Sequence, residues 1–88
     1  MNTFPLKVLA AERTFYDGAC VSLVVPTLDG LYGIQAKHSD VVLAIVPGTV
    51  TLRTDAGEKI AASVSEGILK MEDNRALLLV ETVQEKIG

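Results

Sequence analysis

The chain has 88 residues, of which 49% are apolar, and a formal net charge of −3 with eight lysines and arginines spread singly along it. Scattered basic residues argue against an extended contact with nucleic acid or anionic lipid. The single cysteine and single histidine, Cys20 and His38, are too few for the usual nitrogen and sulfur ligands of zinc, so we expect no metal.

A chain of this length makes one small domain, which we expect to span residues 1–88. Its mean hydropathy of +0.36 is high for a domain with so little interior, and this predicts an apolar patch that a partner covers. The longest apolar runs, 41–46 and 76–80, fall far short of the roughly 20 residues that cross a bilayer as a helix. With one cysteine and no export-signal pattern at the start, we expect a reducing, intracellular environment.

Apolar and polar residues alternate between closely spaced turn signals, which is typical of half-buried strands. The expected turns lie at Asp17-Gly18, Asp29-Gly30, Pro47-Gly48, Asp55-Ala56-Gly57, Glu66-Gly67 and Asp73-Asn74. The expected strands, in chain order, are 5–10, 19–25, 32–36, 49–54, 59–65, 68–72 and 76–82. This pattern predicts an all-β fold, a sandwich of two packed sheets with about eight to ten short, mostly antiparallel strands.

Two segments depart from the simple alternation. Ser39 and Asp40 precede the apolar run 41–46 and could cap a single helical turn there. The run 76–80 is apolar throughout, which predicts a strand covered on both faces. Its second cover is either a neighbouring protein or a loop of the chain itself.

Residues that could carry chemistry do not converge. Cys20 lies in an alternating strand, where a free cysteine behaves as a small apolar residue with a raised pKa. Most carboxylates fall at turns or strand ends, where solvation and backbone capping account for them. We therefore expect no catalytic site, no cofactor and no small-molecule ligand.

Residues 30–39 read Gly-Leu-Tyr-Gly-Ile-Gln-Ala-Lys-His-Ser, with Pro47-Gly48 a short distance on. This resembles the Gly-Glu-x-Gly-Ile-x-Pro-x-His-Ala segment and later Pro-Gly of the epsilon subunit of the F-type ATP synthase. Residues 1–11 resemble the first strand of that family, and Phe15-x-Asp17-Gly18 and 24–27 resemble its Phe-x-Gly and Val-Val-Pro-Thr elements. Residues 65–71 resemble its Ser-Gly-Gly-Phe-Leu-Glu-Val element, so the similarity covers essentially the whole chain.

The resemblance implies a non-catalytic subunit of the central stalk, at the amino-terminal β-sandwich of the family. It implies that the protein couples the gamma shaft to the membrane c ring of a proton-translocating ATP synthase. It also implies a peripheral position on the cytoplasmic face of the membrane that carries the synthase, most simply a bacterial plasma membrane. Family members commonly continue into two inhibitory carboxy-terminal helices, and because this sequence stops at Gly88 we expect that regulation to be absent.

The resemblance also suggests two contact regions. The residues that match positions facing the gamma subunit are Ala10, His38 and Leu43. The residues that match the loop facing the c ring are Leu28, Asp29, Gly30 and Leu31. Leu31 stands where the family usually has Glu, so we expect a less polar ring contact. For His38, a packed or solvated histidine at a strand end is the alternative.

Two other functions remain open at this point. Biotinyl and lipoyl carrier domains are also small and all-β, and Lys70-Met71 contains their Lys-Met pair. The sequence lacks the Ala-Met and Glu of such carriers, and Lys70 falls inside an expected strand instead of at a turn. An unrelated β-sandwich adaptor would use the same apolar surface for a different partner.

Overall fold

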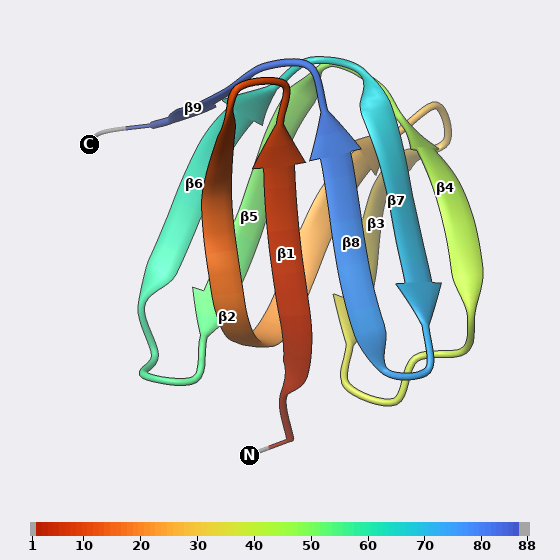
Figure 1. Cartoon of the computed structure of the whole chain (residues 1–88). Coiled ribbons are helices and arrows are strands. Elements are labelled where there is room, and N and C mark those ends of the chain that lie inside the picture. Colours follow the sequence, from red (N-terminus) through yellow and green to blue (C-terminus); the bar gives the residue numbers. More distant parts are fainter. Residues whose placement is uncertain (1, 87–88) are drawn as a thin grey trace.

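All regular structure in the computed structural model, which describes residues 2–86, is β-strand (Figure 1). The strands are β1 (Phe4–Ala10), β2 (Arg13–Thr27), β3 (Gly30–Gln35), β4 (Val41–Ile45), β5 (Gly48–Thr54), β6 (Lys59–Val64), β7 (Gly67–Glu72), β8 (Arg75–Val80) and β9 (Val83–Glu85). Within the described residues, no helix is long and apolar enough to cross a membrane. The all-β prediction and the expected number of strands are confirmed.

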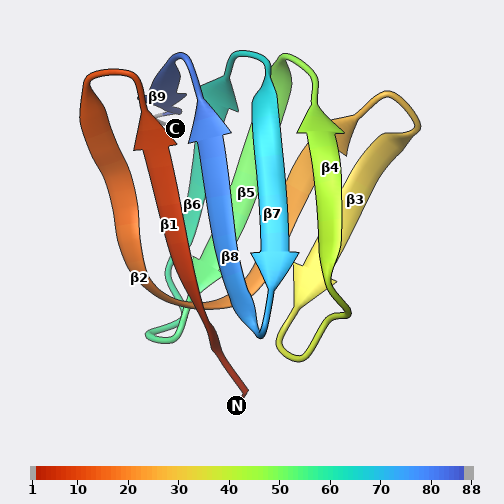
Figure 2. The same cartoon turned by 45° about the vertical axis from the view of Figure 1, so that its right-hand side comes forward.

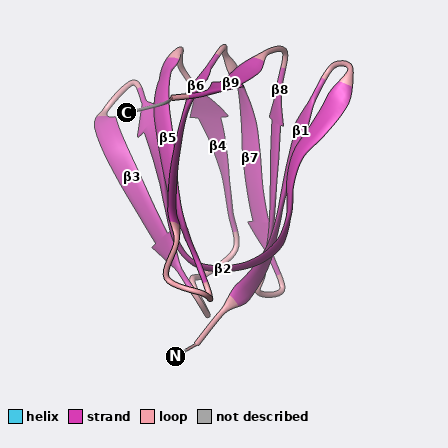
Figure 3. Cartoon of the chain, turned by 90° about the vertical axis from the view of Figure 1, so that its left-hand side faces the viewer, coloured by secondary structure: helices cyan, strands magenta, loops and turns pink. Residues whose placement is uncertain are grey.

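One long strand, β2, joins the two layers of the sandwich. The first half of β2 pairs with β1, and its second half pairs with β3 and β5. The hydrogen-bonded order is β4-β7-β8-β1-β2-β5-β6-β9, with β3 on the other side of β2. Seen edge-on, β2 curves beneath the molecule from one layer to the other (Figure 3). The β4-β7-β8-β1 layer therefore faces the β3-β2-β5-β6 layer, and hydrogen bonding is continuous between them.

Alternate residues of the facing strands form one core. In the first layer Leu6, Leu69 and Leu78 are at most 1% exposed. In the second layer Leu23 and Leu52 are also buried, at 0% and 2% exposed. Since side chains of a strand point alternately to its two faces, this packing fixes which residues point outward.

The expected turn at Asp17-Gly18 is wrong. Both residues lie inside β2, where Gly18 pairs with Leu6 of β1. The first turn is instead the two-residue connection between Ala10 and Arg13. An added Cβ on Gly18 would meet the Tyr16 hydroxyl at 3.2 Å, so the glycine makes room for that side chain and not for a turn.

The expected helical turn after Ser39-Asp40 is also wrong, because residues 41–45 form β4. All five pair with β7, from Val41 opposite Met71 to Ile45 opposite Gly67. β-branched residues favour the strand, and a neighbour with complementary alternation holds it.

The end of the chain differs in a smaller way. The expected strand 76–82 corresponds to β8, which ends at Val80, and the short β9, which pairs with β6, was not predicted. The turns at Asp29-Gly30, Asp55-Ala56-Gly57 and Asp73-Asn74 are where they were expected. Asp73 and Asn74 both have positive φ, 53° and 60°, as a two-residue hairpin turn requires. Gly33 lies within β3, and Gly48, which was expected in a turn with Pro47, is the first residue of β5.

Candidate interaction surfaces

The β2–β3 hairpin presents leucines to solvent. Leu28 is 87% exposed and Leu31 is 74% exposed. Thr27 locks the turn, because its hydroxyl donates to the Gly30 carbonyl at 2.7 Å and accepts the Asp29 N–H at 3.3 Å. Gly30 has φ +108°, which favours glycine over residues with a side chain. The tip is therefore a fixed apolar projection with Asp29 as its single charge.

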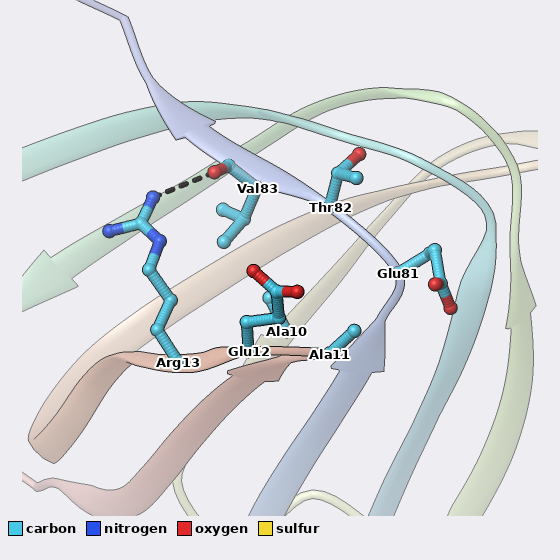
Figure 4. A pocket seen from close by; sticks show the side chains of 7 residues that line it. All are labelled: Ala10, Ala11, Glu12, Arg13, Glu81, Thr82 and Val83. Carbon is cyan, nitrogen blue, oxygen red and sulfur yellow. Dashed lines mark hydrogen bonds between the residues drawn. The ribbon is translucent and has the colours of Figure 1, made fainter.

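Ala10 lies at the end of β1, beside a hollow between the β1–β2 turn and the β8–β9 connection (Figure 4). Arg13 crosses this hollow and donates from Nη2 to the Val83 carbonyl at 2.7 Å. The Ala11 N–H donates to the Glu81 carbonyl at 3.2 Å. Two chain connections distant in sequence are thus tied together around Ala10.

His38 is held within its own corner of the molecule. Nδ1 lies 2.7 Å from the Ser39 carbonyl and therefore carries the proton, because a carbonyl only accepts. Nε2 then accepts from the Tyr32 hydroxyl at 3.1 Å in the neutral ring. The two rings meet edge to face, with centroids 5.6 Å apart. The histidine is half-buried and shapes the β3–β4 loop, in line with the packed alternative.

Leu43 faces inward on β4, opposite Leu69, and packs against the core. Its neighbour Val42 points outward and is 60% exposed. A shallow groove lies between β4 and the β2–β3 hairpin, and its lining includes Leu28, Leu31 and Leu43. The structure therefore brings Leu43 to the hairpin, although the two were predicted to face different partners.

Ala10 and His38 lie far apart. The β1–β2 turn and the tip of the β2–β3 hairpin occur at one end of the sandwich, whereas the β3–β4 loop occurs at the other (Figure 2). In the first layer β1 and β4 flank β8 and β7. Ala10 and His38 therefore mark diagonally opposite corners of that layer.

An apolar surface that no site prediction included lies between these corners. Ile68 and Leu79 are cross-strand partners on the outer face of β7 and β8, and they are 45% and 40% exposed. With Val42 of β4 they form what we call the outer apolar face. In the sequence, the two apolar runs 41–46 and 76–80 pointed to this surface, but the possible helical turn obscured the first. In the described chain Leu79 is 40% exposed, so of the two alternatives for the second cover of residues 76–80, the loop of the chain itself is wrong and a neighbouring protein stays a prediction.

Neither Cys20 nor Lys70 shows the setting of a reactive group. Cys20 is 0% exposed, and its burial raises the pKa of the thiol, as predicted. Lys70 lies in the middle of β7, away from any hairpin tip, and pairs with Glu72 at 3.5 Å. Nothing in the position of Lys70 favours a carrier lysine.

The family described as "ATP synthase, Delta/Epsilon chain, beta-sandwich domain" matches residues 3–86. The chain belongs to this family. A relative, the ATP synthase epsilon chain of Ruminococcus albus, is 34% identical over 85 residues, which cover 96% of this chain and 63% of that protein. The chain thus spans about three fifths of the length of this curated relative.

Chains in two solved structures of mitochondrial ATP synthases share the fold. A chain in the cryo-EM structure of the Euglena gracilis mitochondrial ATP synthase that includes the c-ring superposes with a TM-score of 0.90. It is 17% identical, and the match covers 98% of this chain and 56% of that one. A chain in the central stalk and c-ring structure of the Tetrahymena thermophila mitochondrial ATP synthase gives a TM-score of 0.77 at 16% identity, covering 91% and 64%. At these identities the likeness concerns the fold.

Proposed function

We propose that the protein is a central-stalk subunit of a proton-translocating F-type ATP synthase, which joins the gamma shaft to the membrane c ring and has no catalytic site of its own. In this proposal the chain acts as one β-sandwich domain. It lies as a peripheral protein on the cytoplasmic side of the membrane that carries the synthase. The family match over residues 3–86 is the observation that carries the proposal.

The β2–β3 hairpin is suited to the ring contact. Two leucines at 87% and 74% exposure on a hairpin tip leave apolar area in water that a partner would bury. Full burial of one such side chain is worth about 1.5–3 kcal/mol. Because the Thr27 hydrogen bonds already fix the turn, little conformational entropy is lost on docking.

The shaft contact is assigned to the corners at Ala10 and His38. Each corner is held by side-chain hydrogen bonds, from Arg13 at one and Tyr32 at the other. A partner that contacts both corners holds the sandwich at two separate ends. Two separate contacts prevent the sandwich from rotating relative to that partner.

Continuous hydrogen bonding gives this body the stiffness that coupling needs. β2 belongs to both layers, so a force on the hairpin passes along one covalent strand into the β1 layer. The closely packed core resists sliding of the layers. Such a body transmits torque between two partners with little internal loss.

Affinity recovery of the full chain from detergent-solubilised membranes that contain the synthase tests the proposal. We expect the gamma and c subunits to be recovered with it. Leu28→Asp combined with Leu31→Asp should lower recovery of the c ring at least tenfold, about 1.4 kcal/mol, because charge would enter an apolar contact. Ala56→Asp in the exposed β5–β6 loop is the matched control and should recover the ring normally. Recovery of neither gamma nor the ring by the unmodified chain would contradict the proposal.

A further inference from the structure

Strand β7 carries an outward-facing pattern that is complementary to itself. In β7 and the residue before it, Glu66, Ile68 and Lys70 are exposed, whereas Leu69 and Met71 are buried. Side chains of a strand alternate between its two faces, so the three exposed residues project from the outer face of the first layer. Their order along the strand is an acid, an apolar residue and a base.

The acid and the base cannot neutralise each other within one chain. Four residues of extended strand separate Glu66 from Lys70 by about 13 Å. In residues 2–86 Glu66 forms no ion pair, and Lys70 pairs with Glu72 at 3.5 Å through side chains that are 53% and 62% exposed. An ion pair as exposed as this one is weak, so Lys70 can exchange its partner at little cost.

Strand β8 continues the same polarity beside β7. Ile68 is the cross-strand partner of Leu79 at the apolar centre. A shallow hollow at one end of the two strands contains Glu66 and Glu81. A second hollow, toward their other end, is lined by Lys70, Glu72, Arg75, Ala76 and Leu77. The first end thus carries two carboxylates, and the second carries two cations and one carboxylate.

We propose that a second copy of the chain covers the outer apolar face, with the two β7 strands stacked antiparallel about a two-fold axis at Ile68. A two-fold dimer uses the same patch on both copies, so the patch has to complement itself. The rotation places the acidic end of one copy on the basic end of the other. Ile68 then packs on the partner's Ile68, and Glu66 lies against the partner's Lys70.

The dimensions of the sandwich allow this contact. Packed sheets lie about 10 Å apart, a gap that glutamate and lysine side chains span from opposite sides. The sandwich measures 29 × 27 × 24 Å along its principal axes, so one face is of the order of 700 Å², near the roughly 800 Å² per partner of a standard interface. A contact that covers part of this face belongs to the weaker, reversible class.

The inference does not rest on the proposed function, because every contact in it joins two copies of this chain. It has a consequence for that function. A second copy covers the surface between the corners at Ala10 and His38, so one partner reaches both corners only after the dimer separates. The dimer therefore keeps the free chain out of a larger assembly.

Sedimentation equilibrium of the full chain, from roughly 10 μM to roughly 1 mM, tests the proposal. We expect the mass to rise with concentration from the 9.4 kDa monomer toward twice that value. Ile68→Ser should weaken dimerisation at least about tenfold, because it removes apolar area from both copies at once. The control is Leu28→Ser at the exposed hairpin tip, which should leave dimerisation unchanged. A monomer at every concentration would overturn the proposal.

An exchange of charges tests the antiparallel orientation. Glu66→Lys and Lys70→Glu should each weaken dimerisation at least about tenfold, since like charges then face each other twice in the symmetric contact. The variant with both changes keeps the net charge of the unmodified chain and should recover its affinity within about threefold. Glu58→Lys, at an exposed position of the β5–β6 loop, is the matched control for net charge and should change affinity by less than about twofold.

Circular dichroism melting establishes that each variant is folded. A dimer that survives Ile68→Ser would lie on another surface and overturn the inference. Failure of the doubly changed, folded variant to recover its affinity would overturn the antiparallel arrangement. Recovery of gamma and c subunits by the unmodified chain is a separate measurement, so the loss of the dimer would leave the proposed function standing.

Discussion

Ile68 and Leu69 are neighbours on β7, yet their side chains lie on opposite faces of the strand. Leu69 belongs to an inner row with Leu43 and Leu78 and is 0% exposed, whereas Ile68 belongs to the outer row with Ala44 and Leu79 and is 45% exposed. Both rows are apolar. The difference indicates that the inner row holds the sandwich together and that the outer row is available to a partner.

The largest expected effect comes from truncating the two side chains to alanine and comparing the stabilities of the variants. Leu69→Ala should destabilise the protein by about 2–5 kcal/mol, because it leaves a cavity in the closed core. Ile68→Ala should change stability by less than about 0.5 kcal/mol, because its side chain is half in water already. Urea unfolding of both variants measures this. Equal losses would mean that the outer row is part of the core.

A smaller effect is expected at Gly67, where backbone proximity limits the residue. A Cβ added there would overlap the Leu79 carbonyl oxygen, and a backbone atom cannot rotate away as a side chain can. Gly67→Ala should therefore cost about 1–3 kcal/mol in thermal or urea unfolding.

Gly33→Ala is the control for that change, since nothing lies within 4 Å of the added carbon at Gly33. It should change stability by less than about 0.5 kcal/mol. A Gly67→Ala protein as stable as the control would show that β7 and β8 can separate without loss.

The smallest expected effect on stability is a pH dependence that arises at the bend of β2, where Cys20 is fully buried. Burial raises the thiol pKa above its usual 9.0, so in alkaline solution the unfolded thiol loses its proton before the folded one. The folded state then binds more protons, and stability should fall as the pH rises above about 9. Burial likewise raises the pKa of Tyr16 above 10.0 and continues the fall.

Urea unfolding at several pH values between about 7 and about 10.5 measures this slope. Cys20→Ala should flatten the part just above pH 9 and leave the Tyr16 part in place. A slope unchanged by Cys20→Ala would mean that water reaches the thiol.

Local sequence signals located most strands but not the strand that crosses between layers. β1, β5, β6 and β7 lie close to their predicted ranges because alternation and turn residues are read over a few neighbours. β2 was shortened because Asp17-Gly18 looks like a turn. Its course through that glycine depends on pairing with β1, which no local pattern contains.

The same limit applies to the surfaces. Asp29-Gly30 predicted an exposed hairpin, and the structure confirms one with its leucines in solvent. Leu43 was selected by resemblance, but the register with β7 turns Val42 outward in its place. A shift of one residue reverses the face of every side chain, so exposure follows from register and not from hydrophobicity.

By itself, the sequence determined an all-β sandwich, its main turns and its family, because these depend on alternation, turn chemistry and motif order along the chain. Only the tertiary structure decided that Ala10 and His38 occupy opposite corners and that Ile68 and Leu79 share an outer face. The physical reason is that cross-strand partners are chosen by the packing of a common core. Residues distant in sequence become neighbours only when that core closes.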